Sequence, residues 1–282
     1  MLPTLAGGHK FQDLLNFVHL DEEGFYLCKQ DQQYFLLEGE DTPTRKVQHK
    51  PHVPKVMFLA VVAQPGFDVS ANEMFSGKIG IFPFAEQRAT QRSSAAGGHD
   101  LNKVRRGDKG RYKAKLIEQV IPAVKASWQA ARRRERIWAQ HDNAPSHKIN
   151  DDPDIVRECT ADGWDIKFIS QPANSPDLSI LDLGFFNSIQ SLQNRTTPRM
   201  IDEPINAVNV AFAAQTSEQL GKVWTTLQSI LQEIMLAKSD NAFKIPHLKA
   251  TTERRGRTIR MELLCSEEAW ESAQSAIQSA YQ

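Results

Sequence analysis

Three aspartates stand where side chains from distant parts of the chain can meet. Asp21 follows the apolar residues of "FVHLD", Asp142 ends the run "RIWAQHD", and Asp182 opens a helix expected at about 180–192. In a parallel α/β sheet, ligand sites form beyond the strand ends, so carboxylates that are remote in sequence can converge there. Crowded carboxylates repel one another unless a cation lies between them. Mg²⁺ prefers oxygen ligands, and two ions roughly 3.5 to 4 Å apart would activate the attacking oxygen and stabilise the leaving oxygen of a phosphodiester.

The stretch "IWAQHDNAPSHKIN", residues 137–150, has three competing interpretations: a helix cap, a histidine-bearing metal site, or one arm of a carboxylate cage. In a helical metal phosphohydrolase the His-Asp pair would lie on a helix with further histidine partners. Here it ends a β-like run, so we expect His141 and His147 to pack or to hydrogen-bond around Asp142 rather than to bind metal. Asn143 is expected either to hydrogen-bond the loop or to reach a phosphate.

The first part of the chain reads as short strands. Residues 17–21 and 25–37 are rich in aromatic and β-branched residues and are separated by "DEEG", which predicts a turn. The run "KVMFLAVVA", 55–63, is apolar on both faces, which is typical of a central strand covered by helices on each side. "GKIGIFPF", 77–84, predicts a further strand, and Pro83 marks its end or an edge.

The remainder alternates helix and strand before becoming mostly helical. A helix over 111–131, with a kink or restart at Pro122, precedes the strand that ends at Asp142. A short helix over 153–163 and a strand over 165–170 follow, and this order predicts a parallel crossover. Further helices are expected over 180–192, over 216–238 with a capping box at Thr216 and Gln219, and from Ser266 onward.

Composition limits the function classes. The 282 residues carry 34 basic and 34 acidic side chains, so no global positive field favours a polyanion partner, and any nucleic-acid surface must be local. Three widely spaced cysteines, Cys28, Cys159 and Cys265, exclude a dense disulfide framework and indicate a reducing compartment. The sequence offers no signal peptide and no long apolar run, so we expect an intracellular protein that does not span a membrane.

One basic run stands out in this neutral chain. Residues 86–110 lose apolar periodicity and predict an exposed loop. From there into the following helix, seven cations accompany one acid, Asp108, and they suggest contacts with phosphates. A solvated charged segment is the equally weighted alternative. The cations are Lys103, Arg105, Arg106, Lys109, Arg111, Lys113 and Lys115.

Taken together, several motifs resemble the catalytic domain of mariner-type transposases of the DDE/D superfamily. They occur in the family's order over roughly residues 17–247: "VHLDEEGFYL", "HKPHVPKVMFLAVVAQP", "GKIGIFPF", "QHDNAPSH", "GWDIKFISQPANSPDLSILDLGFFNSIQSLQ" and "NAFKIPH". The resemblance implies an α/β, RNase H-like mixed sheet flanked by helices, with a helical C-terminal extension. The implied divisions are a short segment 1–16, a catalytic domain 17–200 and the extension 201–282.

The resemblance also implies the site. Asp21 and Asp142 match the first and second catalytic acids, and Asp182 rather than Asp177 matches the third, because the family's acid follows the "SPDL" turn. These carboxylates are implied to hold Mg²⁺ or Mn²⁺, as two ions. Water then cuts DNA, and the freed 3′-hydroxyl attacks target DNA for integration. DNA and a second copy of the chain are the implied partners, with no small-molecule substrate, and a eukaryotic element would act in the nucleus.

The sequence departs from the family pattern in two places. Only residues 1–16 precede the first catalytic strand, where relatives carry a helix-turn-helix DNA-binding region, and Glu23-Gly24 stands where relatives often show Lys-Trp. Two hypotheses therefore remain: a metal-dependent strand-transfer or nuclease domain, and a catalytically inactive, truncated transposon-derived protein that binds nucleic acid or another partner. A helical His-Asp metal phosphohydrolase is a distant third.

Overall fold

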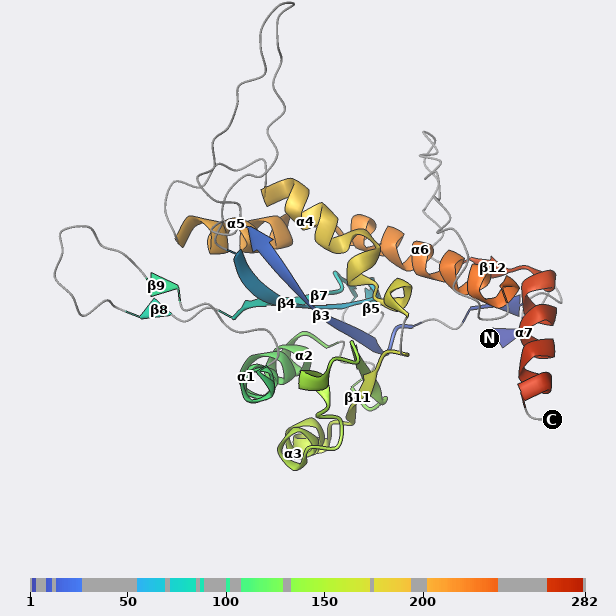
Figure 1. The fold of residues 1–282 in the computed structure, drawn as a ribbon, viewed down its shortest axis with the longest axis horizontal. Coiled ribbons are helices and arrows are strands. Elements are labelled where there is room, and N and C mark those ends of the chain that lie inside the picture. Colours follow the sequence, from blue (N-terminus) through green and yellow to red (C-terminus); the bar gives the residue numbers. More distant parts are fainter. Residues whose placement is uncertain are drawn as a thin grey trace, which may run out of the picture.

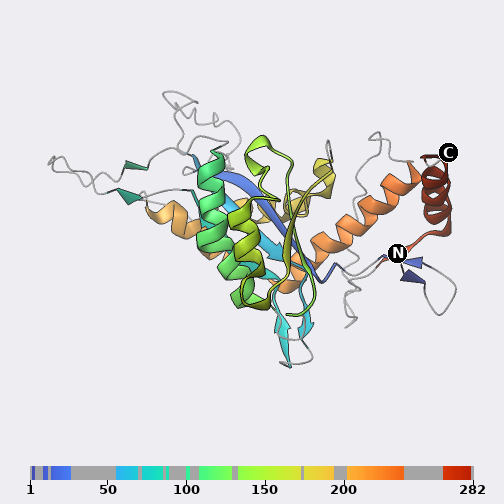
Figure 2. The ribbon, with the colours of Figure 1, turned by 90° about the horizontal axis from the view of Figure 1, so that it is seen from below.

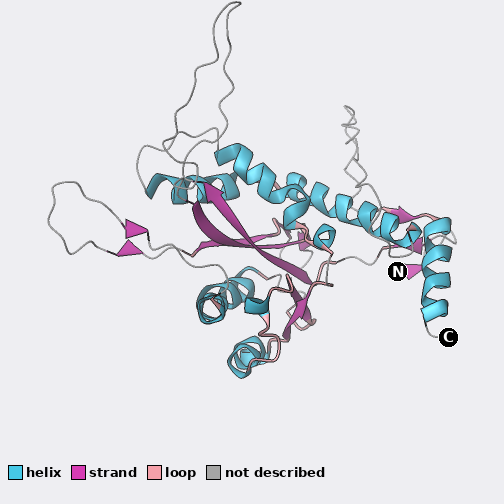
Figure 3. Ribbon diagram, in the orientation of Figure 1, coloured by secondary structure: helices cyan, strands magenta, loops and turns pink. Residues whose placement is uncertain are grey.

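A five-stranded mixed sheet with helices on both faces forms the centre of the protein (Figures 1 and 3). The structure is a computed structural model, and it describes residues 2–3, 9–11, 14–26, 55–68, 72–84, 87–88, 100–101, 108–128, 133–172, 175–193, 202–237 and 263–280. Within the part of the chain so described, no helix is both long and apolar enough to cross a membrane.

The order of strands in the central sheet is β11-β10-β3-β4-β7. β3 (Phe17–Tyr26) pairs antiparallel with β4 (Lys55–Ala63), which pairs antiparallel with the edge strand β7 (Lys78–Pro83). On the other side, β10 (Ile137–His141) runs parallel to both β3 and β11 (Ile166–Ser170). The central strand, the strand ending at Pro83 and the parallel crossover are therefore confirmed.

The prediction of a turn at "DEEG" is wrong. Residues 21–24 continue β3, because every residue from Val18 to Tyr26 has a pairing partner on β4, and this ladder satisfies the backbone groups of the acidic residues. Asp21 consequently lies in the middle of a ten-residue strand rather than at a strand end. The predicted strand residues after Tyr26 lie outside the described part of the chain.

One face of the sheet is covered by α1 (Lys109–Lys115), the π-helical segment η2 (Leu116–Val120), α2 (Ile121–Ser127) and α3 (Pro153–Thr160). Side chains of this face pack against them, including Val18, Leu20, Leu59 and Val61. Pro122 is the second residue of α2, which directly follows the π-helical segment η2. Val120 and Ile121 keep helical φ and ψ angles, so the predicted irregularity at Pro122 is a π-helical segment in a continuous helix rather than a restart.

The opposite face packs under η7 (Leu181–Phe185), α4 (Phe186–Gln193), α5 (Asp202–Ala214) and α6 (Ser217–Leu236). Phe58, Ala60 and Val62 of β4 alternate with the residues of the other face and contact this layer. The predicted capping box at Thr216 and Gln219 is present at the start of α6. Burial on both faces of β4 explains its continuous apolar run.

Smaller elements lie around this framework. β5 (Gly66–Asp68) and β6 (Glu73–Phe75) form a hairpin that projects from the sheet (Figure 2), and β8 (Gln87–Arg88) pairs with β9 (Asp100–Leu101). α6 extends beyond the sheet toward the predicted last helix, α7 (Glu267–Ala280). There it meets a three-stranded sheet of β1 (Leu2–Pro3), β2 (His9–Lys10) and β12 (Leu264–Cys265).

Candidate active site

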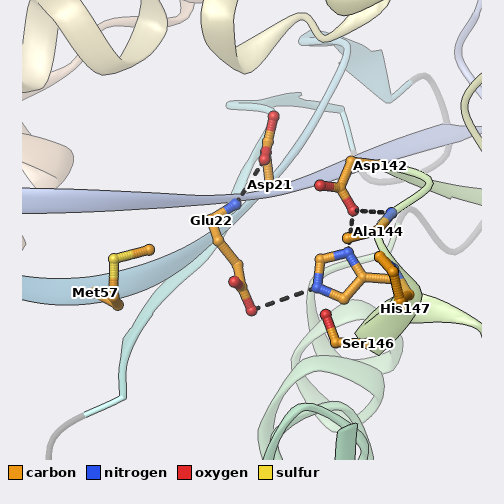
Figure 4. Close-up of a pocket in the computed structure, with 8 residues that line it drawn as sticks. Asp21, Glu22, Met57, Asp142, Ala144, Ser146 and His147 are labelled. Carbon is orange, nitrogen blue, oxygen red and sulfur yellow. Dashed lines mark hydrogen bonds and ion pairs between the residues drawn. The ribbon is translucent and has the colours of Figure 1, made fainter. Parts of the chain in front are cut away.

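A cavity of about 460 Å³ opens beside the middle of β3 and the end of β10 (Figure 4). It lies where two parallel strands bring together residues that are far apart in the sequence. Gln140 pairs with His19, so two further residues along each strand bring Asp142 level with Asp21. The lining residues are Asp21, Glu22, Met57, Asp142, Ala144, Pro145, Ser146 and His147.

Asp21 accepts two hydrogen bonds and is largely removed from water. The Ser179 hydroxyl donates to Oδ2 at 2.6 Å, and the Glu22 N–H donates to Oδ1 at 2.7 Å. Burial is the main cause that raises the pKa of Asp21 to about 7, and the charges of Asp182 and Asp142 add to it, although both hydrogen bonds act in the other direction. The carboxyl group of Asp21 therefore ionises less readily than an ordinary aspartate unless a cation lies nearby.

Asp142 directly follows β10, as predicted, and its side chain is 45% exposed. Its Oδ1 accepts a hydrogen bond from the Ala144 N–H at 3.1 Å and lies against Nδ1 of His147. Burial would raise the pKa of Asp142, but the hydrogen bond and charge of His147 outweigh it and hold that pKa below its usual value. Asp142 is thus the carboxylate of the three that is ionised most readily.

Asp182 lies in the first turn of η7 and is exposed. Partial desolvation raises its pKa, and the negative charges of Glu23 and Asp142 raise it further. Glu23 is the residue at which the chain departs from the family pattern, and strand alternation puts it on the same face of β3 as Asp21. The departure therefore adds negative charge next to the third acid. Asp177 lies in the preceding 3₁₀ turn, Pro176–Leu178.

Two glutamines anchor the "SPDLS" segment that carries Ser179 and leads into η7. Gln140 of β10 donates through Nε2 to the Leu178 carbonyl at 3.2 Å, and Gln171 donates to the Ser175 carbonyl. The Asp182 N–H in turn donates to the Ser179 carbonyl at 3.1 Å. These bonds tie the start of η7 to the ends of β10 and β11, which fixes Asp182 relative to the sheet.

The donor chemistry fits a hard divalent cation. Three carboxylates interact electrostatically, two of them have raised proton affinities, and a cation would relieve both effects. Across the residues that the structure describes, however, no three carboxylate, histidine or cysteine side chains are gathered closely enough to hold an ion. Asp21, Asp142 and Asp182 thus share one region without closing around a single point.

His141 is occupied by structural contacts. Nδ1 lies 3.1 Å from the Tyr112 hydroxyl, and Nε2 lies 2.8 Å from Oδ1 of Asn150, which requires an N–H on Nε2 and leaves Nδ1 to accept from Tyr112. Burial lowers the pKa of His141 to about 4, so the ring is neutral. Both ring nitrogens make hydrogen bonds within the protein, and the expectation that His141 packs in the interior is met.

His147 lies between two carboxylates. Nδ1 contacts Asp142, and Nε2 is 3.5 Å from Oε1 of Glu22 (Figure 4). Burial alone would lower the pKa of His147, but its hydrogen bonds and charge interactions with Asp142 and Glu22 raise it to about 9. The ring is therefore an imidazolium at neutral pH. As expected from the sequence, it contacts Asp142 through a hydrogen bond.

The basic run is largely engaged within the protein where it is described. Lys113 pairs with Asp152 at 2.6 Å and Asp154 at 2.7 Å, and Lys115 donates to the Pro83 carbonyl at 2.9 Å. Arg111 pairs with Asp108, while Lys109 is exposed, as is Asn143 in the loop after β10. Lys103, Arg105 and Arg106 lie outside the described residues. Contacts of this run with phosphates remain a prediction.

Sequence reasoning missed three residues of the site. Glu22 was missed because a turn was predicted at its position. Had β3 been predicted there, strand alternation would have placed Glu22 on the opposite face from Asp21. Tyr112, 2% exposed, stacks on His147 with ring centroids 3.9 Å apart. Ser179 is buried against Asp21, and no local pattern distinguishes it from the other polar residues of its turn.

Comparison with solved structures identifies the fold. A chain of a pre-cleavage Mos1 transpososome superposes with a TM-score of 0.58 at 17% identity, over 82% of this chain and 58% of that chain. A chain of the Mos1 mariner paired end complex with Mn gives 0.56 at 18% identity, over 82% and 57% respectively. The protein thus spans somewhat more than half the length of the solved chains that it matches.

Neither a known protein-family description nor a curated protein matches the sequence. At these identities the likeness concerns the fold, and it agrees with the resemblance carried by the motifs. The chain has the mixed α/β, RNase H-like fold seen in the matched part of these Mos1 chains.

Proposed function

We propose that the protein is a metal-dependent DNA strand-cleavage and strand-transfer domain that acts by in-line phosphoryl transfer. The observation that carries this proposal is that Asp21, Asp142 and Asp182 come from three different elements and lie close enough to interact electrostatically, with Asp21 and Asp142 lining an open cavity. Phosphoryl transfer needs little more from a protein than positioning and charge neutralisation. No nucleophilic side chain is required.

Asp21, Asp142 and Asp182 are the residues that would hold two Mg²⁺ or Mn²⁺ ions. When bound, such ions activate water or a 3′-hydroxyl and stabilise the leaving oxygen. The chain itself supplies rigidity: β3 is paired along its length with β4, and Ser179 fixes the rotamer of Asp21. Asp142, whose pKa is held below its usual value, would provide a charged ligand beside the cavity.

DNA is the proposed partner. The solved chains of similar fold belong to a Mos1 transpososome, a Mos1 paired end complex with Mg and a Mos1 strand transfer complex. Lys103, Arg105, Arg106, Lys109, Arg111 and Asn143 are proposed to contact it. A homodimer would bind two DNA ends together, and in a eukaryotic cell it would act in the nucleus.

A second function, binding DNA or a partner without cleavage, has its own support. Glu23 raises the pKa of Asp182, and within the described residues no closed metal-binding group is present. A chain that retains the fold but no longer gathers its acids would behave in this way. It would bind DNA in a salt-dependent manner and leave it intact.

Cleavage of a supercoiled plasmid and of labelled duplexes, with Mg²⁺ or Mn²⁺, tests the choice. We expect the unaltered chain to nick DNA and Asp142→Asn to lose this activity. Asp151→Asn is the matched control, because Asp151 is an exposed carboxylate on the loop after the site. Equal nicking by the unaltered chain and Asp142→Asn would reject the enzyme, and intact DNA with salt-dependent binding would favour the second function.

A further inference from the structure

His147 is built into the protein at a fixed orientation. Its side chain is 4% exposed and lies in the 3₁₀ turn Pro145–His147, where its N–H donates to the Ala144 carbonyl at 2.9 Å. Its carbonyl accepts from the Ile149 N–H at 2.8 Å. The backbone of His147 is therefore held on both sides, and the ring enters the interior from a defined point.

Stacking holds the plane of the ring. Tyr112 lies against it with centroids 3.9 Å apart and an interplanar angle of 28°, and the ring of His141 follows at 5.5 Å and 16°. Tyr112 is itself fixed by its hydrogen bond to His141, which Asn150 holds from the other side. These contacts restrict rotation of the His147 ring and so set the directions in which its two nitrogens point.

The two ring nitrogens of His147 face carboxylates from two different parts of the sheet. Nδ1 meets Asp142, just past β10, and Nε2 faces Glu22 of β3 at 3.5 Å (Figure 4). Oδ1 of Asp142 is thereby shared between His147 and the Ala144 N–H, and the other carboxylate oxygen points away from His147. These two contacts fix the orientation of a carboxylate that is otherwise half-exposed beyond a strand end.

We propose that His147 is a positioning residue that bridges Glu22 to Asp142 and so presents the free oxygen of Asp142 to a divalent cation. The inference rests on the proposed function, because it concerns the same metal site. His147 does not bind the metal: its Nδ1 is committed to Asp142, and Nε2 is buried and directed at Glu22. Outer residues of this kind commonly change metal affinity by about 10-fold to 100-fold.

The test measures Mn²⁺ affinity of the full chain by electron paramagnetic resonance of free Mn²⁺, with nicking rates alongside. We expect His147→Ala to weaken Mn²⁺ binding by about 10-fold or more. His147→Asn retains a donor near the position of Nδ1 and should recover much of the affinity, whereas His147→Gln should not. His9→Ala is the control, since it removes a histidine ring that stacks on Trp270 in the first turn of α7, outside the candidate site.

A double-mutant cycle tests the bridge. Glu22→Gln alone should weaken Mn²⁺ binding, and in the His147→Ala background it should weaken it less, because Glu22 acts through His147. Additive effects would overturn the bridge, and equal Mn²⁺ affinity of the unaltered chain and His147→Ala would overturn the positioning role. Absence of Mn²⁺ binding by the unaltered chain would instead overturn the proposed function, and the inference with it. Should His147→Ala unfold, the contrast between His147→Asn and His147→Gln decides.

Discussion

Replacing Asp21 with asparagine should stabilise the metal-free protein at neutral and alkaline pH. The pKa of Asp21 is raised from 3.8 to about 7, chiefly by burial. A raised carboxyl pKa means that the folded state binds the proton more tightly than the unfolded state. Stability is therefore lost as pH rises from about 4 and the loss is complete above about 7. Each pKa unit corresponds to about 1.4 kcal/mol, so the full penalty is about 4 kcal/mol.

Asparagine keeps the shape and the acceptor oxygen of the side chain and has no charge to desolvate. About 4 kcal/mol is an upper value for the gain, because the amide gives up the charge-assisted hydrogen bond from Ser179. The assay is urea unfolding of the full chain between pH 4 and 8 with a chelator present, comparing the unaltered chain, Asp21→Asn and the control Asp151→Asn. The difference in unfolding free energy should grow with pH and vanish near pH 4. A difference that is absent at pH 8, or that does not vary with pH, would refute the reasoning.

Three further outcomes are expected. Mn²⁺ should raise the melting temperature of the unaltered chain but not of Asp142→Asn. A ligand at 100 times its Kd adds about 2.7 kcal/mol to the free energy of unfolding. An equal rise in both proteins would count against the metal site. Lys78→Met should lower the unfolding free energy by about 1.5 to 3 kcal/mol in urea, because the ammonium donates to two backbone carbonyls at the end of α5, at 2.6 and 2.7 Å; no loss would show those bonds to be unimportant. Glu23→Gln should lower the pKa of Asp182, measured by carboxyl NMR, and an unchanged titration would contradict the proximity of the two groups.

Local patterns predicted most of the elements. The unbroken apolar run of β4 reported burial on both faces, Pro122 marked an irregularity in the helix formed by η2 and α2, and Thr216 with Gln219 marked the start of α6. Each of these signals depends on residues within one or two turns or on strict alternation, so it can be read without knowing the partners. The motifs around the three aspartates likewise indicated the fold, which the solved structures confirm.

The wrong prediction of a turn at "DEEG" shows that local sequence patterns do not identify the partners of a strand. Acidic residues and glycine favour a turn by themselves, but in the protein they continue β3, because residues 55–63 supply a complete ladder of partners. The basic run was ambiguous for the same reason. Lys113 is neutralised by Asp152 and Asp154 of the segment that begins α3, and nothing near Lys113 in the sequence announces those partners.

The sequence by itself determined the kinds of residue at the site, the strand end that carries Asp142 and the helix that carries Asp182. Tertiary structure alone decided their chemistry. Ser179 contacts Asp21 across 158 residues, and His147 joins Asp142 to Glu22 between separate strands. The physical reason is that burial and charge interactions depend on distances in space, which only the packed sheet and its two helical layers fix.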